Sequence, residues 1–178
     1  MRESSGSNIE KTLRKAVKVL AAFRIPHYVC GGFAVQEHGY PRFTVDVDLI
    51  VPDIAVAREM LCLNGFKENP TSATTVIDSE TRVEIDPLPA GGKVDPGPLS
   101  FPIPVQVSEE PQIVSLESLI GSKLSGYMGR GIDRVQDYAD VVRLIRANHL
   151  PREYGLDESV RDLYHRIWDE LHRNRSKE

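Results

Sequence analysis

Hydrophobic residues recur every three to four positions in several stretches of the chain, which is the spacing of amphipathic helices. The first helix is expected to end before Pro26, because proline disfavours helical backbone at the residue before it. Asp53, Ser115 and Asp157 each precede such a stretch and are expected to be N-caps. The predicted helices cover residues 8–24, 53–63 and 133–147 and the stretches that follow Ser115 and Asp157.

Short apolar runs between these helices predict the strands of a mixed sheet. Pro87 is expected to end one strand, because proline has no N–H to donate to a neighbouring strand. The predicted strands cover residues 28–30, 44–51, 81–85 and 105–107. The fold class is therefore α/β (α+β), with helices on the sheet and a C-terminal helical extension. We expect a core over residues 1–110 and a helical part over residues 111–178 that packs on it as one compact unit.

The strand over residues 44–51 places two aspartates on one face. Alternate side chains of a strand share a face, so Asp46 and Asp48 lie together, opposite the apolar positions. Two like charges about 4 Å apart repel by about 4 kcal/mol at an effective dielectric of about 20. A set of oxygen ligands favours a hard cation such as Mg²⁺, or Mn²⁺ in its place. The alternative is an acidic strand edge that discourages pairing with other chains.

Gly31 and Gly32 stand between a short buried strand and a short helix predicted over residues 33–38. Glycine lets backbone N–H groups approach a phosphate closely, and a helix N-terminus adds partial positive charge. A glycine pair alone is weak evidence, because most such pairs are turns. Its position one element before the two aspartates makes a phosphate site the favoured interpretation.

Composition limits the classes of function. The chain has 178 residues, of which 40% are hydrophobic and 27% are charged, enough for a real core. No apolar run approaches the length of a membrane span, and the N-terminus is polar, so we expect a soluble, cytoplasmic protein without a membrane partner. The formal charge of −4 argues against a broad nucleic-acid-binding surface.

The glycine pair and the aspartates together resemble a known pattern. They are similar to the nucleotidyltransferase superfamily to which DNA polymerase β belongs and, within it, to small prokaryotic proteins of the AbiEii toxin type. The resemblance implies a nucleotidyltransferase core in which the glycines and Thr44 hold the triphosphate and the paired carboxylates bind Mg²⁺. The matching positions are Gly31, Gly32, Phe33, Ala34, Gly39, Arg42, Thr44, Asp46 and Asp48.

The resemblance also implies residues outside this stretch. A third carboxylate is expected on the strand beside the two aspartates; Asp86 is favoured, and Glu84, on the same face, is the alternative. Lys123 is expected to hold the nucleotide phosphates, and Asp137 to belong to the same site, although a lysine that extends to solvent is the other interpretation. Arg134 and Asp140 match the remaining positions of the pattern. The predicted catalytic and metal-binding residues are Asp46, Asp48 and Asp86, and the predicted nucleotide-binding residues are Gly31, Gly32, Thr44, Lys123 and Asp137.

The sequence therefore predicts an Mg²⁺-dependent (or Mn²⁺-dependent) transferase. It would move a nucleotidyl group from an NTP, with ATP as the first candidate, to a hydroxyl of RNA or protein, as one component of a toxin–antitoxin pair with an antitoxin partner. Three alternatives remain open: an inactive nucleotidyltransferase-fold copy that acts as a binding module or antitoxin, a nucleotide-sugar glycosyltransferase, and a structural domain with an acidic strand edge.

Overall fold

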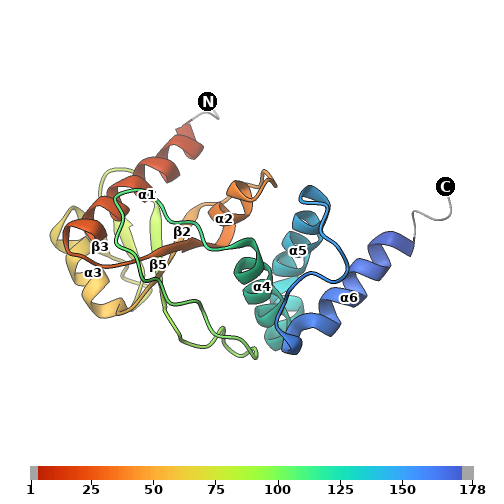
Figure 1. The fold of residues 1–178 in the computed structure, drawn as a ribbon. Helices are drawn as coiled ribbons and strands as arrows, with labels where there is room; N and C mark the ends of the chain where they lie inside the picture. The colour runs from red at the N-terminus through yellow and green to blue at the C-terminus, as the bar shows by residue number, and fades with distance from the viewer. Residues whose placement is uncertain (1–3, 174–178) are drawn as a thin grey trace. The chain divides into compact units, whose positions relative to one another are not determined.

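The computed structural model describes residues 4–173 and contains one mixed sheet together with helices (Figure 1). The chain divides into two compact units. The first contains the chain up to Ala34, Arg42–Gly92 and Phe101–Val114, and the second contains Val35–Pro41, Lys93–Ser100 and the chain from Ser115. In order, the elements are α1 (Ser4–Ala22), β1 (Tyr28–Cys30), α2 (Gly31–Glu37), β2 (Asp46–Val51), α3 (Ile54–Leu63), β3 (Phe66–Glu68), β4 (Val76–Asp78), β5 (Glu84–Pro89), α4 (Leu116–Arg130), the 3-10 helix η1 (Gly131–Arg134), α5 (Val135–Ala147) and α6 (Glu158–Arg173).

The five strands lie in the order β1-β2-β5-β4-β3. β2 pairs antiparallel with β1 and parallel with β5, and the β5-β4-β3 half is antiparallel. The expected mixed sheet flanked by helices is thus confirmed. Of the expected N-caps, Asp53 accepts a hydrogen bond from the backbone of Val56, and Ser115 accepts one from the backbone of Ser118. None of the described helices is both long and apolar enough to cross a bilayer.

One face of the sheet is covered by α1 and α3. Leu13, Val17 and Leu20 of α1 have no exposed surface and pack in one cluster with Leu61 of α3. From the sheet the cluster takes alternate residues of β2 and their neighbours, as expected when only one face of a strand is apolar. These sheet residues are Val29, Val47, Leu49, Val51, Phe66, Val76, Val83 and Ile85.

The strand β5 continues through two prolines, so the expectation that Pro87 ends the pairing is wrong. β5 pairs with β2 as far as Pro89, whereas its pairing with β4 stops at Ile85. The amide of Ala90 donates to a carbonyl of β2, which shows that even-numbered residues of this stretch face β2. Pro87 and Pro89 therefore face the other side, where β4 no longer pairs with β5. Their lack of an N–H group costs no hydrogen bond there.

Other elements also differ from expectation. β3 and β4 were not predicted, because three-residue strands are too short to show a period of two. The predicted strand at residues 105–107 is irregular instead: Val105 and Val107 are exposed, and in the described part of the chain their amides pair with no other backbone group. The helix expected from residue 133 begins as η1 and becomes α-helical at Val135.

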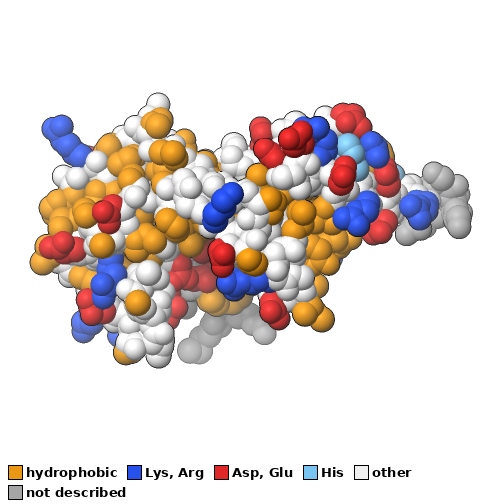
Figure 2. Space-filling view, turned by 90° about the horizontal axis from the view of Figure 1, so that it is seen from below, with side chains coloured by type: hydrophobic (Ala, Val, Ile, Leu, Met, Phe, Trp, Pro, Cys, Tyr) orange, Lys and Arg blue, Asp and Glu red, His pale blue; other side chains and the backbone are white. Residues whose placement is uncertain are grey.

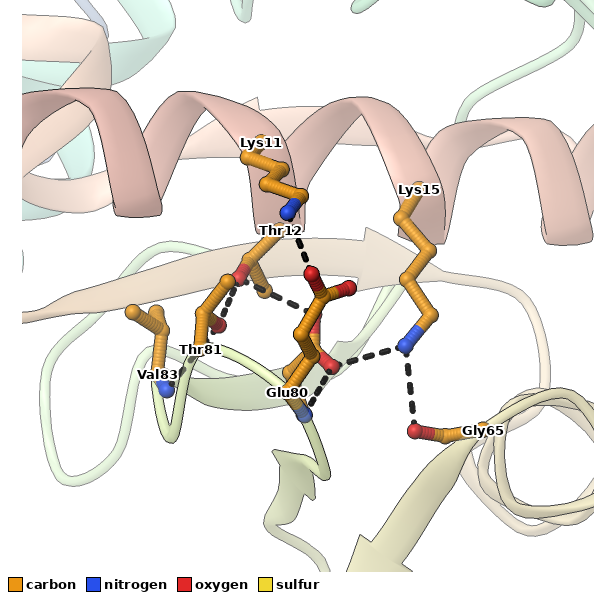
Figure 3. Close-up of polar contacts among 8 residues, drawn as sticks. Lys11, Thr12, Lys15, Gly65, Glu80, Thr81 and Val83 are labelled. Carbon is orange, nitrogen blue, oxygen red and sulfur yellow. Dashed lines mark hydrogen bonds and ion pairs between the residues drawn. The ribbon is translucent and has the colours of Figure 1, made fainter.

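A buried aspartate fastens α1 to the end of β4 (Figure 3). Asp78 has no exposed surface, and its carboxylate accepts hydrogen bonds from Lys15 Nζ at 2.7 Å, from the Glu80 amide at 3.0 Å and from Thr12 Oγ1 at 3.2 Å. Lys15 Nζ also donates to the carbonyl of Gly65 at 3.1 Å. Burial alone would raise the pKa of Asp78, but these hydrogen bonds and the ammonium charge outweigh it and lower the pKa.

Replacing Lys15 by methionine should destabilise the fold, because the buried carboxylate of Asp78 would lose its cation. We expect the free energy of unfolding, measured by urea denaturation at pH 7, to fall by about 2–4 kcal/mol. Lys11→Met is the matched control, since Lys11 pairs with Glu80 at the exposed surface and such pairs contribute less than about 1 kcal/mol. Equal effects of the two substitutions would contradict this account.

His27, directly before β1, is buried without a hydrogen-bond partner. It has no exposed surface, and neither ring nitrogen is hydrogen-bonded within the described residues. Burial lowers the pKa of His27, because the imidazolium ion would lose its hydration. The folded state therefore holds this ring neutral at pH values where an unfolded chain would protonate it.

Stability should accordingly decrease on mild acidification. Below the unfolded pKa of about 6.5 the unfolded chain binds one proton more than the folded chain at His27, so unfolding becomes easier by up to about 1.4 kcal/mol per pH unit. The variant His27→Leu should lack this contribution. Urea unfolding at pH 7.5, 6.5 and 5.5 tests this, and an unchanged pH slope in His27→Leu would refute it.

Candidate active site

Four carboxylates share one face of the sheet, opposite the face that α1 covers. The parallel register pairs Asp46 with Glu84 and Asp48 with Asp86. In both strands these residues alternate with fully buried ones such as Val47 and Ile85, so all four side chains leave the sheet on the same side. Neighbouring strands lie about 4.8 Å apart. Asp46, Asp48 and Asp86 were predicted to meet, and the register brings them together along with Glu84.

The glycine pair at the start of α2 lies directly against this acidic face. Gly31 has φ +61°, and a Cβ there would lie 1.7 Å from Asp48 Oδ2. A Cβ on Gly32 would lie 2.5 Å from Thr44 Oγ1. Both positions therefore need glycine, one for its backbone conformation as well as for space. The predicted residues Gly31, Gly32 and Thr44 thus lie beside the aspartates of β2.

Uncharged side chains hold three of the carboxylates. Thr44 is buried, and its hydroxyl donates to Asp46 Oδ1 at 2.9 Å. The amide of Asn69 donates to Glu84 Oε1 at 3.0 Å, and the hydroxyl of Thr75 donates to Asp86 Oδ1 at 2.5 Å. Within the described residues, none of these three carboxylates forms an ion pair with lysine, arginine or histidine. Neutral donors fix the oxygens without cancelling their charge.

This charge density suits a divalent cation. Two carboxylates about 5 Å apart repel by about 3 kcal/mol at an effective dielectric of about 20. Among the described residues, no group of three or more His, Cys, Asp and Glu side chains is placed so that it could hold a metal ion. Mg²⁺ does not require such a group, because it is commonly held by one or two carboxylates and completed by water and substrate phosphates. The donor set around Asp46 and Asp48 therefore fits a Mg²⁺ or Mn²⁺ ion that shares its ligands with a nucleotide.

The second compact unit contains the predicted lysine. Lys123 of α4 is 6% exposed, and its Nζ lies 3.0 Å from Asp137 Oδ1 and 2.6 Å from Asp140 Oδ2, both on α5. Asp140 also accepts a hydrogen bond from Gln136 at 2.9 Å, and Asp137 lies 3.4 Å from the guanidinium of Arg134. The residues of the predicted Lys and R..D..D pattern are therefore in mutual contact. The ammonium of Lys123 does not extend to solvent but is neutralised by two carboxylates.

Solved structures share this architecture. The crystal structure of ANT(2'')-Ia in complex with adenylyl-2''-tobramycin matches with a TM-score of 0.55 at 12% identity, covering 91% of this chain and 97% of that chain. The solution structure of the antibiotic-resistance factor ANT(2'')-Ia gives 0.53 at 12% identity, covering 94% and 95%. A nucleotidyltransferase-like antigenic protein from Paracoccidioides brasiliensis gives 0.63 at 15% identity, covering 97% and 92%. The chain has the nucleotidyltransferase fold.

At the level of sequence, neither a protein-family model nor a curated protein matches the chain. The assignment to the nucleotidyltransferase fold therefore rests on three-dimensional similarity, and the low identities carry no information about substrate.

Two residues at the acidic face of this nucleotidyltransferase fold were missed from the sequence. Asn69 and Thr75 lie in the connection between β3 and β4, which showed no hydrophobic period. Their contacts with Glu84 and Asp86 depend on β4 pairing with β5. The only local signal was the run of small polar residues from Asn69 to Thr75, which is typical of turns in general.

Removing the ammonium of Lys123 should destabilise the second unit, because the fully buried carboxylate of Asp140 would lose the cation that lies 2.6 Å away. We expect Lys123→Met to lower the free energy of unfolding by about 3–5 kcal/mol. The double variant Lys123→Met/Asp140→Asn should recover part of this loss, since the buried negative charge is removed. Urea denaturation of the wild type and both variants measures the effect. A double variant no more stable than Lys123→Met would contradict the ion-pair account.

Proposed function

We propose that the protein is an Mg²⁺-dependent nucleotidyltransferase that moves a nucleotidyl group from an NTP, with ATP as the first candidate, to a hydroxyl of a larger acceptor. The observation that carries the proposal is the register of β2 and β5, which sets Asp46 and Asp48 opposite Glu84 and Asp86 at the glycine pair. Support comes from the nucleotidyltransferase fold of the chain and from the neutral partners of three of these carboxylates: Thr44 donates to Asp46, Asn69 to Glu84 and Thr75 to Asp86.

In the proposed mechanism Asp46 and Asp48 hold the cation, and Asp86, with Glu84 as the alternative, completes the metal site. Mg²⁺, when bound, polarises the phosphates and lowers the pKa of the acceptor hydroxyl. Gly31 and Gly32, which would hold the triphosphate in this proposal, let Asp48 and Thr44 lie directly against the start of α2. The acceptor oxygen bonds to the α-phosphorus as the bond to pyrophosphate breaks, and Asp86 takes the hydroxyl proton as general base.

We propose that Lys123 and Asp137 take part in nucleotide binding, which requires a change in the ion pairs of Lys123. The ammonium of Lys123 already lies within 3.0 Å of two carboxylates, so it can bind a phosphate only by weakening one of these ion pairs. Asp137 is the more exposed partner, with 15% of its side chain accessible, against 0% for Asp140. Asp137 is therefore the partner that would give way.

The proposed acceptor hydroxyl follows from the sequence resemblance and from one of the similar structures. An RNA or protein hydroxyl, in a toxin–antitoxin setting of the AbiEii type with an antitoxin partner, follows from the sequence resemblance. Figure 2 shows lysine and arginine interspersed with aspartate and glutamate on the face it displays. The complex of ANT(2'')-Ia with adenylyl-2''-tobramycin supports a small-molecule hydroxyl as a second candidate.

The first test is loss of nucleotide binding and transfer in the carboxylate variants. Asp46→Asn and Asp48→Asn should each reduce transfer from an α-labelled NTP by at least about a hundredfold, because the cation loses a ligand. Asp53→Asn is the control, since Asp53 caps α3 and an asparagine still caps. If Asp46→Asn binds Mg²⁺-ATP in calorimetry as tightly as the wild type, the enzyme proposal fails and the binding-module alternative is favoured.

The acceptor class can be found by incubating the protein with each α-labelled NTP, Mg²⁺ and fractionated cell lysate. Label that appears in RNA, in protein or in small molecules in the wild type but not in Asp46→Asn identifies the acceptor. Label in none of the fractions with any NTP would count against transferase activity.

The third carboxylate can be identified by comparing Glu84→Gln with Asp86→Asn. Asp86 is partly buried opposite Asp48, whereas Glu84 is exposed opposite Asp46. We expect Asp86→Asn to lower the rate of transfer by about a hundredfold or more, because the acceptor hydroxyl would lose its base. Glu84→Gln should lower the rate less than Asp86→Asn does. A larger loss in Glu84→Gln than in Asp86→Asn would assign the base to Glu84.

A further inference from the structure

The connection between β3 and β4 contacts both carboxylates of β5. Asn69 and Thr75 lie at its two ends and are 9% and 5% exposed. Resting on the proposed function, we propose that Asn69 and Thr75 are positioning residues, which hold the carboxylates of Glu84 and Asp86 in place for cation binding. They touch neither nucleotide nor cation themselves in this proposal and act through the two acids.

Backbone hydrogen bonds make this connection rigid. The amide of Asn69 donates to the carbonyl of Thr75 at 3.1 Å, so the two ends are tied to each other. Inside it, the amide of Ser72 donates to the carbonyl of Asn69 at 3.3 Å, and the amide of Thr75 donates to Ser72 Oγ at 3.2 Å. The side chains of Asn69 and Thr75 therefore project from a fixed backbone, which is what a positioning residue requires.

The direction of the hydroxyl hydrogen bonds follows from the charge of Asp86. An ionised carboxylate can only accept, so Thr75 must give its one hydroxyl proton to Asp86 Oδ1. Ser72 Oγ, 2.7 Å from Thr75 Oγ1, must then donate to Thr75. A chain of hydrogen bonds from Ser72 through Thr75 thus ends on one oxygen of Asp86. The second oxygen, Oδ2, makes no hydrogen bond within residues 4–173 and is available to a cation.

The orientation of the Asn69 amide is fixed in the same way. Its Oδ1 accepts from the backbone amide of Thr71 at 2.9 Å and from Thr71 Oγ1 at 2.8 Å. A backbone amide can only donate, so the atom that faces Thr71 must be the oxygen. The NH₂ group therefore faces Glu84 Oε1 and donates to it at 3.0 Å.

Neutral donors are suited to this task. A lysine or arginine in their place would cancel the charge that attracts the cation, whereas a hydroxyl and an amide orient an oxygen and leave its charge in place. Outer partners of metal-binding groups typically contribute about ten- to a hundredfold in metal affinity or activity. The same order of effect is expected for Thr75.

The test compares three threonine variants in a Mn²⁺ titration followed by electron paramagnetic resonance. Thr75→Val keeps the shape but removes the hydroxyl, and it should weaken Mn²⁺ binding by about ten- to a hundredfold. Thr75→Ser restores a donor and should return to within about threefold of the wild type. Thr74→Val is the matched control, because Thr74 is exposed in the same connection and forms no hydrogen bond in the described part of the chain. It should leave Mn²⁺ affinity unchanged.

The outcomes separate this inference from the proposed function. If the wild type binds Mn²⁺ and Thr75→Val binds it equally well, the positioning role is refuted and the transferase proposal stands. If the wild type binds Mn²⁺ no better than Asp46→Asn does, the proposed function fails, and the positioning role fails with it. Should Thr75→Val not fold, as judged by thermal unfolding without metal, Asn69→Ala provides the same comparison at Glu84.

Discussion

Repulsion among carboxylates is the constraint around which this sheet is organised. Two aspartates of β2 and two acids of β5 project from one face at the spacing of neighbouring strands. Proteins avoid such an arrangement unless something offsets the repulsion. Here the other face supplies the stability, because it is packed under α1 and α3, and the acidic face is ordered by neutral hydrogen bonds. Asp46, Glu84 and Asp86 are therefore held by partners that leave their negative charge in place.

The acidic face depends on features that lie outside it. β5 stays paired with β2 beyond Ile85, although it contains two prolines. This is possible because the prolines face the side on which β4 no longer pairs with β5, so no N–H donor is needed there. β4 in turn is fastened to α1 through the hydrogen-bonded ion pair of buried Asp78 with Lys15. Through β4, the connection that carries Thr75 is held beside Asp86. Packing on one face thereby fixes the geometry of the charges on the other.

The second unit solves a related problem differently. There two aspartates are compensated within the protein by Lys123, whose ammonium lies between them. The described partners of Asp46 and Asp86 are threonine hydroxyls instead, which leave the charge of these two carboxylates in place.

Local sequence patterns determined much of this protein. The apolar periods gave α1, α3 and the later helices, and the spacing of Asp46 and Asp48 placed two acids on one face, because side-chain direction in a strand depends on the backbone alone. The tertiary structure decided the rest. Pairing between β2 and β5 determined which acids meet, and the three-residue strands β3 and β4 exist only because neighbours complete their hydrogen bonds. The partners Asn69 and Thr75 could not be found from sequence, since contacts between distant segments have no local signal.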